Sequence, residues 1–277
     1  MGLKNPLPEK LKPNTGLLWK VQGAGLSQPS FLFGTIHMIP ARDFFFSRAA
    51  DSVFRLCRTL VMEMDISDPT LQMKVLKAMQ MDSGITLSSL FRRGQYKKLQ
   101  KRVGKFGFTM EMFEKFMPIV VQQNFILRHT MGSEVKSYEL HLLGLARQME
   151  MEVVGLEEVQ EQVKALRSIP LPEQAEMLKK SILRPATARR ELFKFIRYYR
   201  EGEIEKLLKF SNSKKSLRNS LESLLYERNR RWIPRLKGLM TKNSVFVAVG
   251  AAHLAGPQGL IALLRQDGYT VEAIPSF

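Results

Sequence analysis

Two histidines in this chain follow a glycine by three positions, and each Gly-x-x-His motif comes directly after an apolar stretch. His37 follows the stretch Phe31–Ile36, and His253 follows the stretch Val245–Val249. The chain has only four histidines. A histidine just beyond a strand can present its imidazole at the edge of a sheet, where it can bind a metal ion or transfer a proton. We therefore predict that the two motifs are two halves of one site.

Carboxylates follow two further predicted strands. Glu63 lies near the end of the stretch 59–65, and Glu157 directly follows the stretch 151–156. In an open α/β sheet, ligands bind beyond the carboxyl ends of parallel strands. If the four strands are parallel neighbours, two imidazoles and two carboxylates meet at one edge. Such a set can bind a divalent metal ion and activate water, or it can perform general acid–base catalysis without a metal.

Arg228 is a further candidate because it lies on the apolar stripe of a predicted helix. Its neighbours on the stripe are Leu221, Leu225 and Trp232, at steps of four, three and four residues. An arginine that faces inward needs an acidic or anionic partner, either a carboxylate of the site or the substrate. The alternative is that its aliphatic stem packs while its guanidinium reaches water.

The other candidates also have simpler explanations. A histidine at a strand end can be a capping or surface residue, and Glu63 could face water from an edge strand. Glu157 and Glu158 open a predicted helix, where acidic residues suit the helix dipole without any catalytic role.

The elements that must position these residues indicate an α/β core with a large helical insertion. Apolar strands are predicted at about 17–22, 31–36, 59–65, 151–156, 245–249 and 269–274. Residues 1–16 are predicted to be a flexible arm and 17–277 a single domain, whose middle regions at about 69–150 and 171–242 are mostly helical. Met73, Leu76 and Met79, in steps of three, predict the apolar face of one of these helices. Strands that alternate with helical crossovers favour the α/β class.

Composition is that of a soluble globular protein, with 44% hydrophobic and 25% charged residues among 277. No apolar run approaches the roughly 20 residues needed to span a bilayer, and no signal peptide is visible. We therefore expect a cytoplasmic protein, or an exported one if the true start lies upstream. The single cysteine, Cys57, cannot form an internal disulfide and is expected to be a small buried residue.

The net charge of +17 is concentrated in one region. Residues 179–242 hold 19 Lys and Arg against 6 Asp and Glu. A basic surface can attract nucleic acid or an anionic membrane. Because no nucleic-acid-binding signature accompanies the charge, nucleic acid is an unexpected partner. We interpret the region as the solvated face of long helices, with association to an anionic surface as the weaker alternative. The sequence does not indicate an oligomeric state.

An ordered set of motifs resembles the TraB/GumN family, which also includes the TIKI metalloproteases. The matching segments are Leu18-Trp19, Phe33-Gly-Thr-Ile-His-Met38, Glu63 in its Val-Met-Glu-Met-Asp setting, Tyr138-Glu139, Gly155-Leu-Glu157, Glu161-Gln162, Arg228-Asn229, Val249-Gly-Ala-Ala-His253 and Gly256-Pro-Gln-Gly259. One Gly-x-x-His motif is weak support, but the ordered set is specific. It runs from about residue 17 to the C-terminus.

The resemblance implies a core related to the erythromycin-esterase and ChaN-like folds, in which two halves bring the Gly-x-x-His motifs together. For TIKI-like members, the resemblance implies peptide hydrolysis that depends on a divalent metal ion. Manganese or cobalt is the favoured ion, and zinc is a further candidate. Transferred by motif, His37, Glu63 and His253 would be metal-site or catalytic residues, and we expect them to hold the metal. Glu158 departs from the threonine that the family often has at this position, which weakens the transfer to Glu157.

We therefore expect a metal-dependent hydrolase that acts on peptides or proteins. In this hypothesis Glu63 or Glu157 takes a proton from the metal-bound water, and Arg228 steadies a substrate carboxylate or the developing oxyanion. The competing hypothesis is a non-catalytic protein that sequesters a peptide or pheromone in the same cleft. The substrate itself cannot be identified from these motifs.

Overall fold

The computed structural model describes residues 15–127, 131, 134–213 and 218–275. The predicted arm at 1–16 therefore lies almost wholly outside the described residues. Lys214 and Lys215 of the basic region also lie outside them.

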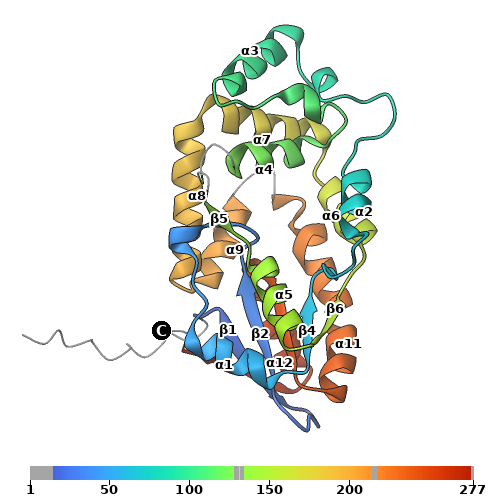
Figure 1. Ribbon diagram of the computed structural model, residues 1–277, viewed down its shortest axis with the longest axis vertical. Helices are drawn as coiled ribbons and strands as arrows, with labels where there is room; N and C mark the ends of the chain where they lie inside the picture. Colours follow the sequence, from blue (N-terminus) through green and yellow to red (C-terminus); the bar gives the residue numbers. More distant parts are fainter. Residues whose placement is uncertain (1–14, 128–130, 132–133, 214–217, 276–277) are drawn as a thin grey trace, which may run out of the picture.

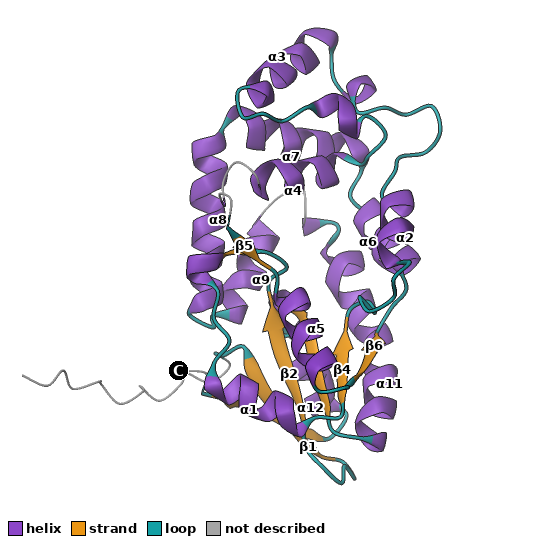
Figure 2. Ribbon diagram, in the orientation of Figure 1, coloured by secondary structure: helices purple, strands orange, loops and turns teal. Residues whose placement is uncertain are grey.

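Six strands form one mixed sheet in the order β6-β4-β7-β2-β1-β8 (Figures 1 and 2). Their bounds are β1 Leu18–Gly23, β2 Ser30–Thr35, β4 Thr59–Met62, β6 Glu152–Gly155, β7 Val245–Gly250 and β8 Tyr269–Ile274. The strands β6, β4, β7 and β2 run parallel to one another, whereas β1 is antiparallel to β2 and β8. The predicted strands and the α/β class are thus confirmed, and the four strands that precede the candidate residues lie side by side.

A small second sheet joins the segment after His37 to the segment before Glu139. Its strands are β3, Ile39–Pro40, and β5, Val135–Lys136, and they pair antiparallel. Because His37 and Glu139 lie just outside this pairing, the ladder holds the two side chains near each other.

Helices account for the long middle of the chain. They are α1 Arg48–Leu56, α2 Leu71–Ala78, α3 Arg93–Gly104, α4 Pro118–Ile126, α5 Tyr138–Gln148, α6 Val159–Arg167, α7 Leu171–Leu183, α8 Pro185–Arg200, α9 Ile204–Ser213, α11 Glu227–Lys242 and α12 Leu260–Gln266. A π-helical turn, Glu222–Tyr226, leads into α11, which continues through Pro234 without a new start. In Figure 1, α1 and α5 lie in front of the sheet and α11 and α12 pack behind it.

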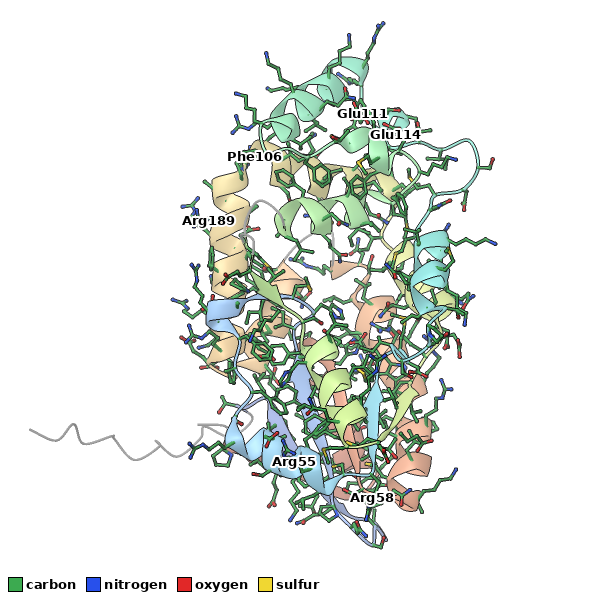
Figure 3. The ribbon with its side chains drawn as sticks, in the orientation of Figure 1. Arg55, Arg58, Phe106, Glu111, Glu114 and Arg189 are labelled. Carbon is green, nitrogen blue, oxygen red and sulfur yellow. The ribbon has the colours of Figure 1, made fainter. Side chains whose placement is uncertain are left out.

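The sheet and the helical insertion have separate cores. The largest core surrounds the sheet and includes Trp19, Phe246 and, as predicted, the buried Cys57. A second core joins α3, α4 and α7 beyond the ends of the strands, in the upper part of the molecule where Phe106 is labelled in Figure 3. There Glu114, also labelled in Figure 3, accepts hydrogen bonds from the backbone and hydroxyl of Ser88.

The predicted apolar face of α2 is wrong at two of its three residues, whereas Met79 is partly buried. Met73 and Leu76 are 71% and 51% exposed. The side that packs instead includes Leu71, Val75 and Ala78, which are partly buried against a third apolar cluster. Positions four and three residues apart stay on one side of a helix, whereas a repeated step of three drifts around it.

The basic region is largely solvated on α8, as predicted. Arg189, Arg190 and Lys194 are exposed, and Arg189 points away from the molecule in Figure 3. Association with an anionic surface stays a prediction. No helix within the described ranges is long and apolar enough to cross a membrane.

The close approach of β4 and β6 sets the spacing of Glu63 and Glu157. The ladder continues past the paired residues Met62 and Gly155, because the backbone N–H of Glu157 donates to the carbonyl of Glu63 at 3.0 Å. A methyl group at Gly155 would lie 2.6 Å from the backbone nitrogen of Asp65. Only glycine fits here without moving the backbone.

We predict that Gly155→Ala lowers the free energy of unfolding by about 1–3 kcal/mol, because the added methyl group forces the two chains apart. Urea denaturation measures the loss. The matched control is Gly238→Ala in α11, where an added methyl group meets nothing within 4 Å. There alanine should stabilise the helix by about 0.5–1 kcal/mol. A Gly155→Ala protein as stable as the wild type would contradict the steric argument.

Candidate functional site

Arg228 lies at the centre of a buried cluster at the carboxyl ends of β4, β6 and β7. It is 6% exposed. Its Nε donates to both carboxylate oxygens of Glu157, at 3.1 and 2.9 Å. Its Nη2 donates to Glu63 Oε2 at 2.6 Å and to Glu157 Oε1 at 2.5 Å. The guanidinium thus bridges the two carboxylates, which confirms that Arg228 faces inward to an acidic partner.

The remaining nitrogen of Arg228 is also fully used. Nη1 donates to the carbonyl of Leu224 at 3.0 Å and lies 3.1 Å from Nε2 of His253. A guanidinium has five N–H groups, and the contacts above account for all five. In this arrangement Arg228 has no donor left for a substrate carboxylate or oxyanion, the role that the sequence suggested for it.

Glu63 is held in its ionised form. Its Oε1 accepts from the backbone N–H of Gly250 at 2.9 Å, and its Oε2 accepts from Gln162 at 3.2 Å as well as from Arg228. Burial by itself would raise the pKa of Glu63, but the positive charge of Arg228 and the other favourable contacts of the carboxylate together outweigh burial and hold the pKa well below its usual range. The hydrogen bond from Gly250 acts in the same direction.

The pKa of Glu157 is shifted in the opposite direction. Glu157 is 4% exposed, and burial raises its pKa above the usual value although Arg228 pulls the other way. The negative charge of Glu63 on the same guanidinium adds to the increase. The two carboxylates that share Arg228 are therefore chemically unlike.

His253 is buried and neutral. Its Nδ1 lies 2.6 Å from Oδ1 of Asn229, while Nδ2 of Asn229 donates to the carbonyls of His253 and Gln258. Because the amide nitrogen of Asn229 is committed as a donor, its oxygen must accept, so we assign the proton of His253 to Nδ1. Nε2 then accepts from Arg228. Burial lowers the pKa of His253 to about 3, and its ring packs on Trp232 at a centroid distance of 4.5 Å.

His37 differs from His253 in being exposed, with 67% of its side chain accessible. Its Nδ1 lies 3.0 Å from Oε1 of Glu139, the second residue of α5. Glu139 is itself held by the hydroxyl groups of Thr35 and Ser137, at 3.1 and 2.8 Å. The hydrogen bond to Glu139 raises the pKa of His37 to about 9, against the effect of desolvation.

The charges of His37 and the buried cluster affect one another. The pKa of His37 is raised by Glu63 and lowered by Arg228, and that of Glu63 is lowered by His37. Both motifs therefore contribute to one electrostatic environment, although the direct partner of His37 is Glu139.

Glu139, Asn229 and Gln162 orient the predicted residues, and sequence reasoning did not include them among the site residues. Each follows or lies within a segment of the family resemblance, namely Tyr138-Glu139, Arg228-Asn229 and Glu161-Gln162. That resemblance was the one signal for them. The contacts of each depend on how distant segments pack.

The residues as arranged do not fit a metal ion. Across the described part of the chain, no group of three or more His, Cys, Asp or Glu side chains is placed to hold one. Nε2 of His253 is 3.9 Å from Glu63, but the guanidinium of Arg228 contacts both. The prediction that His37, His253 and Glu63 hold a metal stays a prediction.

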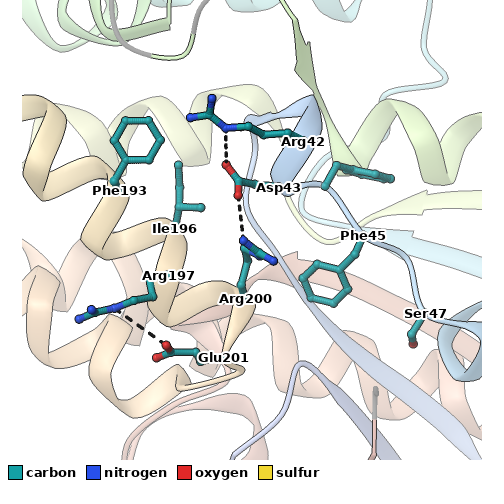
Figure 4. A pocket seen from close by; sticks show the side chains of 10 residues that line it. Arg42, Asp43, Phe45, Ser47, Phe193, Ile196, Arg197, Arg200 and Glu201 are labelled. Carbon is teal, nitrogen blue, oxygen red and sulfur yellow. Dashed lines mark hydrogen bonds and ion pairs between the residues drawn. The ribbon is translucent and has the colours of Figure 1, made fainter. Parts of the chain in front are cut away.

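Two cavities lie away from this cluster. One of about 730 Å³ is lined by residues of α8 and of the loop after β3, where Asp43 contacts both Arg42 and Arg200 (Figure 4). The other, of about 570 Å³, includes His141. Neither is lined by the predicted site residues. Among those residues His37 is exposed, whereas the other four are buried.

The chain matches the sequence profile of the TraB/PrgY/gumN family over residues 17–273. This match covers most of the chain, which therefore belongs to that family. No solved structure gives a significant match, so the finer likeness to erythromycin-esterase and ChaN-like folds stays a prediction.

Curated relatives are similar along nearly the whole chain. Metalloprotease TIKI2 of Danio rerio is 23% identical over 97% of this chain and 62% of its own length. Metalloprotease TIKI1 of Xenopus tropicalis is 21% identical over 98% of this chain and 64% of its own length. Metalloprotease TIKI1 of Homo sapiens is 21% identical over 96% of this chain and 64% of its own length. The chain thus spans less than two thirds of these relatives. Their names describe these relatives as metalloproteases.

We predict that Asn229→Asp lowers the free energy of unfolding by about 1–3 kcal/mol. Aspartate can still accept from Nδ1 of His253, but it cannot donate to the two carbonyls, which lose their partner in a buried setting. Chemical denaturation measures the loss. Asn243→Asp, at the exposed end of α11, is the control and should leave stability within about 0.5 kcal/mol. Equal stability of the two variants would contradict the role given to the amide.

Proposed function

We propose that this member of the TraB/PrgY/gumN family is a peptidase-like hydrolase that acts at the carboxyl ends of β2, β4, β6 and β7. The observation that carries the proposal is the exposed imidazole of His37, held by Glu139 beside the buried cluster of Glu63, Glu157, Arg228 and His253. An oriented imidazole beside paired carboxylates is typical of general acid–base catalysis. The names of the relatives favour a peptide or protein substrate.

His37 is the residue that we propose to meet the substrate. Its Nδ1 is engaged by Glu139, which leaves Nε2 as the atom for proton transfer to or from water, or to the leaving amine. Glu139 is a positioning residue, because it acts by fixing the orientation of the ring. The hydroxyl groups of Thr35 and Ser137 fix Glu139 in turn.

The charges of the buried cluster set the electrostatic environment in which the proposed reaction takes place. Arg228 stabilises the negative charges of Glu63 and Glu157, and in this arrangement it does not contact the substrate. Glu63 remains ionised beside it. Glu157, whose pKa is raised by burial, is the carboxylate better suited to exchange a proton.

Whether the proposed hydrolysis depends on a divalent metal ion is decided by experiment. The names of the metalloprotease relatives favour a metal ion, and the family resemblance makes manganese or cobalt the first choice and zinc the third. The donors that the sequence suggests are His37, His253 and Glu63. Because the residues as arranged do not fit an ion, no step is assigned to it.

We predict that the purified protein cleaves members of a peptide library, and that His37→Ala lowers kcat/KM by about 10²–10⁴-fold, the usual contribution of a general acid or base. Glu139→Gln should lower kcat/KM by a smaller factor, because the amide oxygen of glutamine can still accept a hydrogen bond from Nδ1 of His37. Cleavage is followed by mass spectrometry after EDTA treatment, and again with manganese, cobalt or zinc. His141→Ala is the matched histidine control and should retain activity, because the ring of His141 packs against Phe44 and Phe46.

Two results would contradict this proposal. Peptides that bind and are recovered intact under every metal condition would favour the sequestering protein instead. Equal activity of the wild type and His37→Ala would show that hydrolysis occurs elsewhere.

A further inference from the structure

We propose that Arg228 is the built-in cation of this site, and that it occupies the position that a divalent metal ion would need. The atoms that such an ion would bind are carboxylate oxygens of Glu63 and Glu157 and Nε2 of His253, the ring nitrogen that carries no proton. Arg228 contacts all three, at 2.6, 2.5 and 3.1 Å. A metal ion can therefore bind between them only by displacing the guanidinium.

The charge of the cluster requires a cation at this place. Glu63 and Glu157 are 9% and 4% exposed, and two buried carboxylates cannot both stay ionised without positive charge nearby. His253 does not supply it, because its Nδ1–H tautomer is neutral and burial disfavours a second proton. Arg228 is the cation in direct contact with both carboxylates.

Several contacts besides the carboxylates hold Arg228 in position. Nη1 donates to the carbonyl of Leu224, within the π-helical turn that precedes α11. The guanidinium also lies over the ring of Trp232, 4.7 Å from its centroid, and cations favour this position over an indole. Since all five N–H groups are bonded, moving the side chain would break contacts on every side of it.

The inference does not rest on the proposed hydrolase function. It concerns the binding of a metal ion alone, which is measured without any peptide. A protein that cleaves nothing could still confirm it, and an active hydrolase could still overturn it.

The experiment is a titration with Mn²⁺, in which electron paramagnetic resonance reports the free ion. In Arg228→Met, the released carboxylates and His253 should bind Mn²⁺ about tenfold or more tightly than the wild type does, the scale on which neighbouring groups alter metal affinity. Adding His253→Ala to Arg228→Met should abolish the gain. Arg231→Met is the matched control, because Arg231 lies on the same helix, is exposed and pairs with Glu161; its affinity should equal that of the wild type.

The proposal is overturned if Arg228→Met binds Mn²⁺ no more tightly than the wild type. It is also overturned if the wild type binds Mn²⁺ tightly and loses that affinity in Glu63→Gln, because the ion would then share the cluster with Arg228. If Arg228→Met does not fold, the double variant Glu157→Leu/Arg228→Met removes a charge pair together and avoids an uncompensated buried charge. It should still bind Mn²⁺ more tightly than the wild type through Glu63 and His253, and equal affinity overturns the proposal.

Discussion

The burial of two carboxylates around one guanidinium is the constraint on which the rest of this site depends. Glu63 follows β4, Glu157 follows β6, and Arg228 comes from α11, so the three charges come together only when all three elements are in place. Removing one partner of such a group leaves an uncompensated buried charge, which is far more costly than removing the whole group. The carboxyl ends of β4 and β6 and the N-terminal turns of α11 must therefore form as one unit.

A second constraint is steric, and it joins the two Gly-x-x-His motifs. β2 and β7 are parallel neighbours, with Gly34 opposite Val249. A methyl group at Gly34 would lie 3.0 Å from the Cα of Ala251, so the glycine of the first motif leaves room for the turn of the second. The hydroxyl of Tyr199 in α8 donates to the carbonyl of Gly34 at 2.9 Å. The helical insertion is thereby attached to the strand that precedes His37.

The sequence was most informative where burial alone decided the outcome. The apolar strands and the inward position of Arg228 could be predicted, because an apolar stripe that includes an arginine requires an acidic partner at the core. Contacts that depend on the packing of distant segments could not be predicted. Glu139 meets His37 where β3 pairs with β5, and residue spacing gives no sign of that pairing. The face of α2 was misassigned because the apolar residues at Met73 and Leu76 offered a second stripe that the fold leaves exposed.

The two histidines show how similar local motifs can acquire different chemistry. Each follows a glycine by three positions at the end of a parallel strand, and each is oriented through Nδ1. The partner of His37 is the carboxylate of Glu139, whereas the partner of His253 is the amide of Asn229. A carboxylate favours the charged imidazolium, and an amide in a buried setting does not. The site therefore combines one exposed imidazole, whose pKa is raised to about 9, with one buried imidazole that remains neutral. Because the partners come from α5 and α11, the helices decide the chemistry of each motif, while the strands decide only its position.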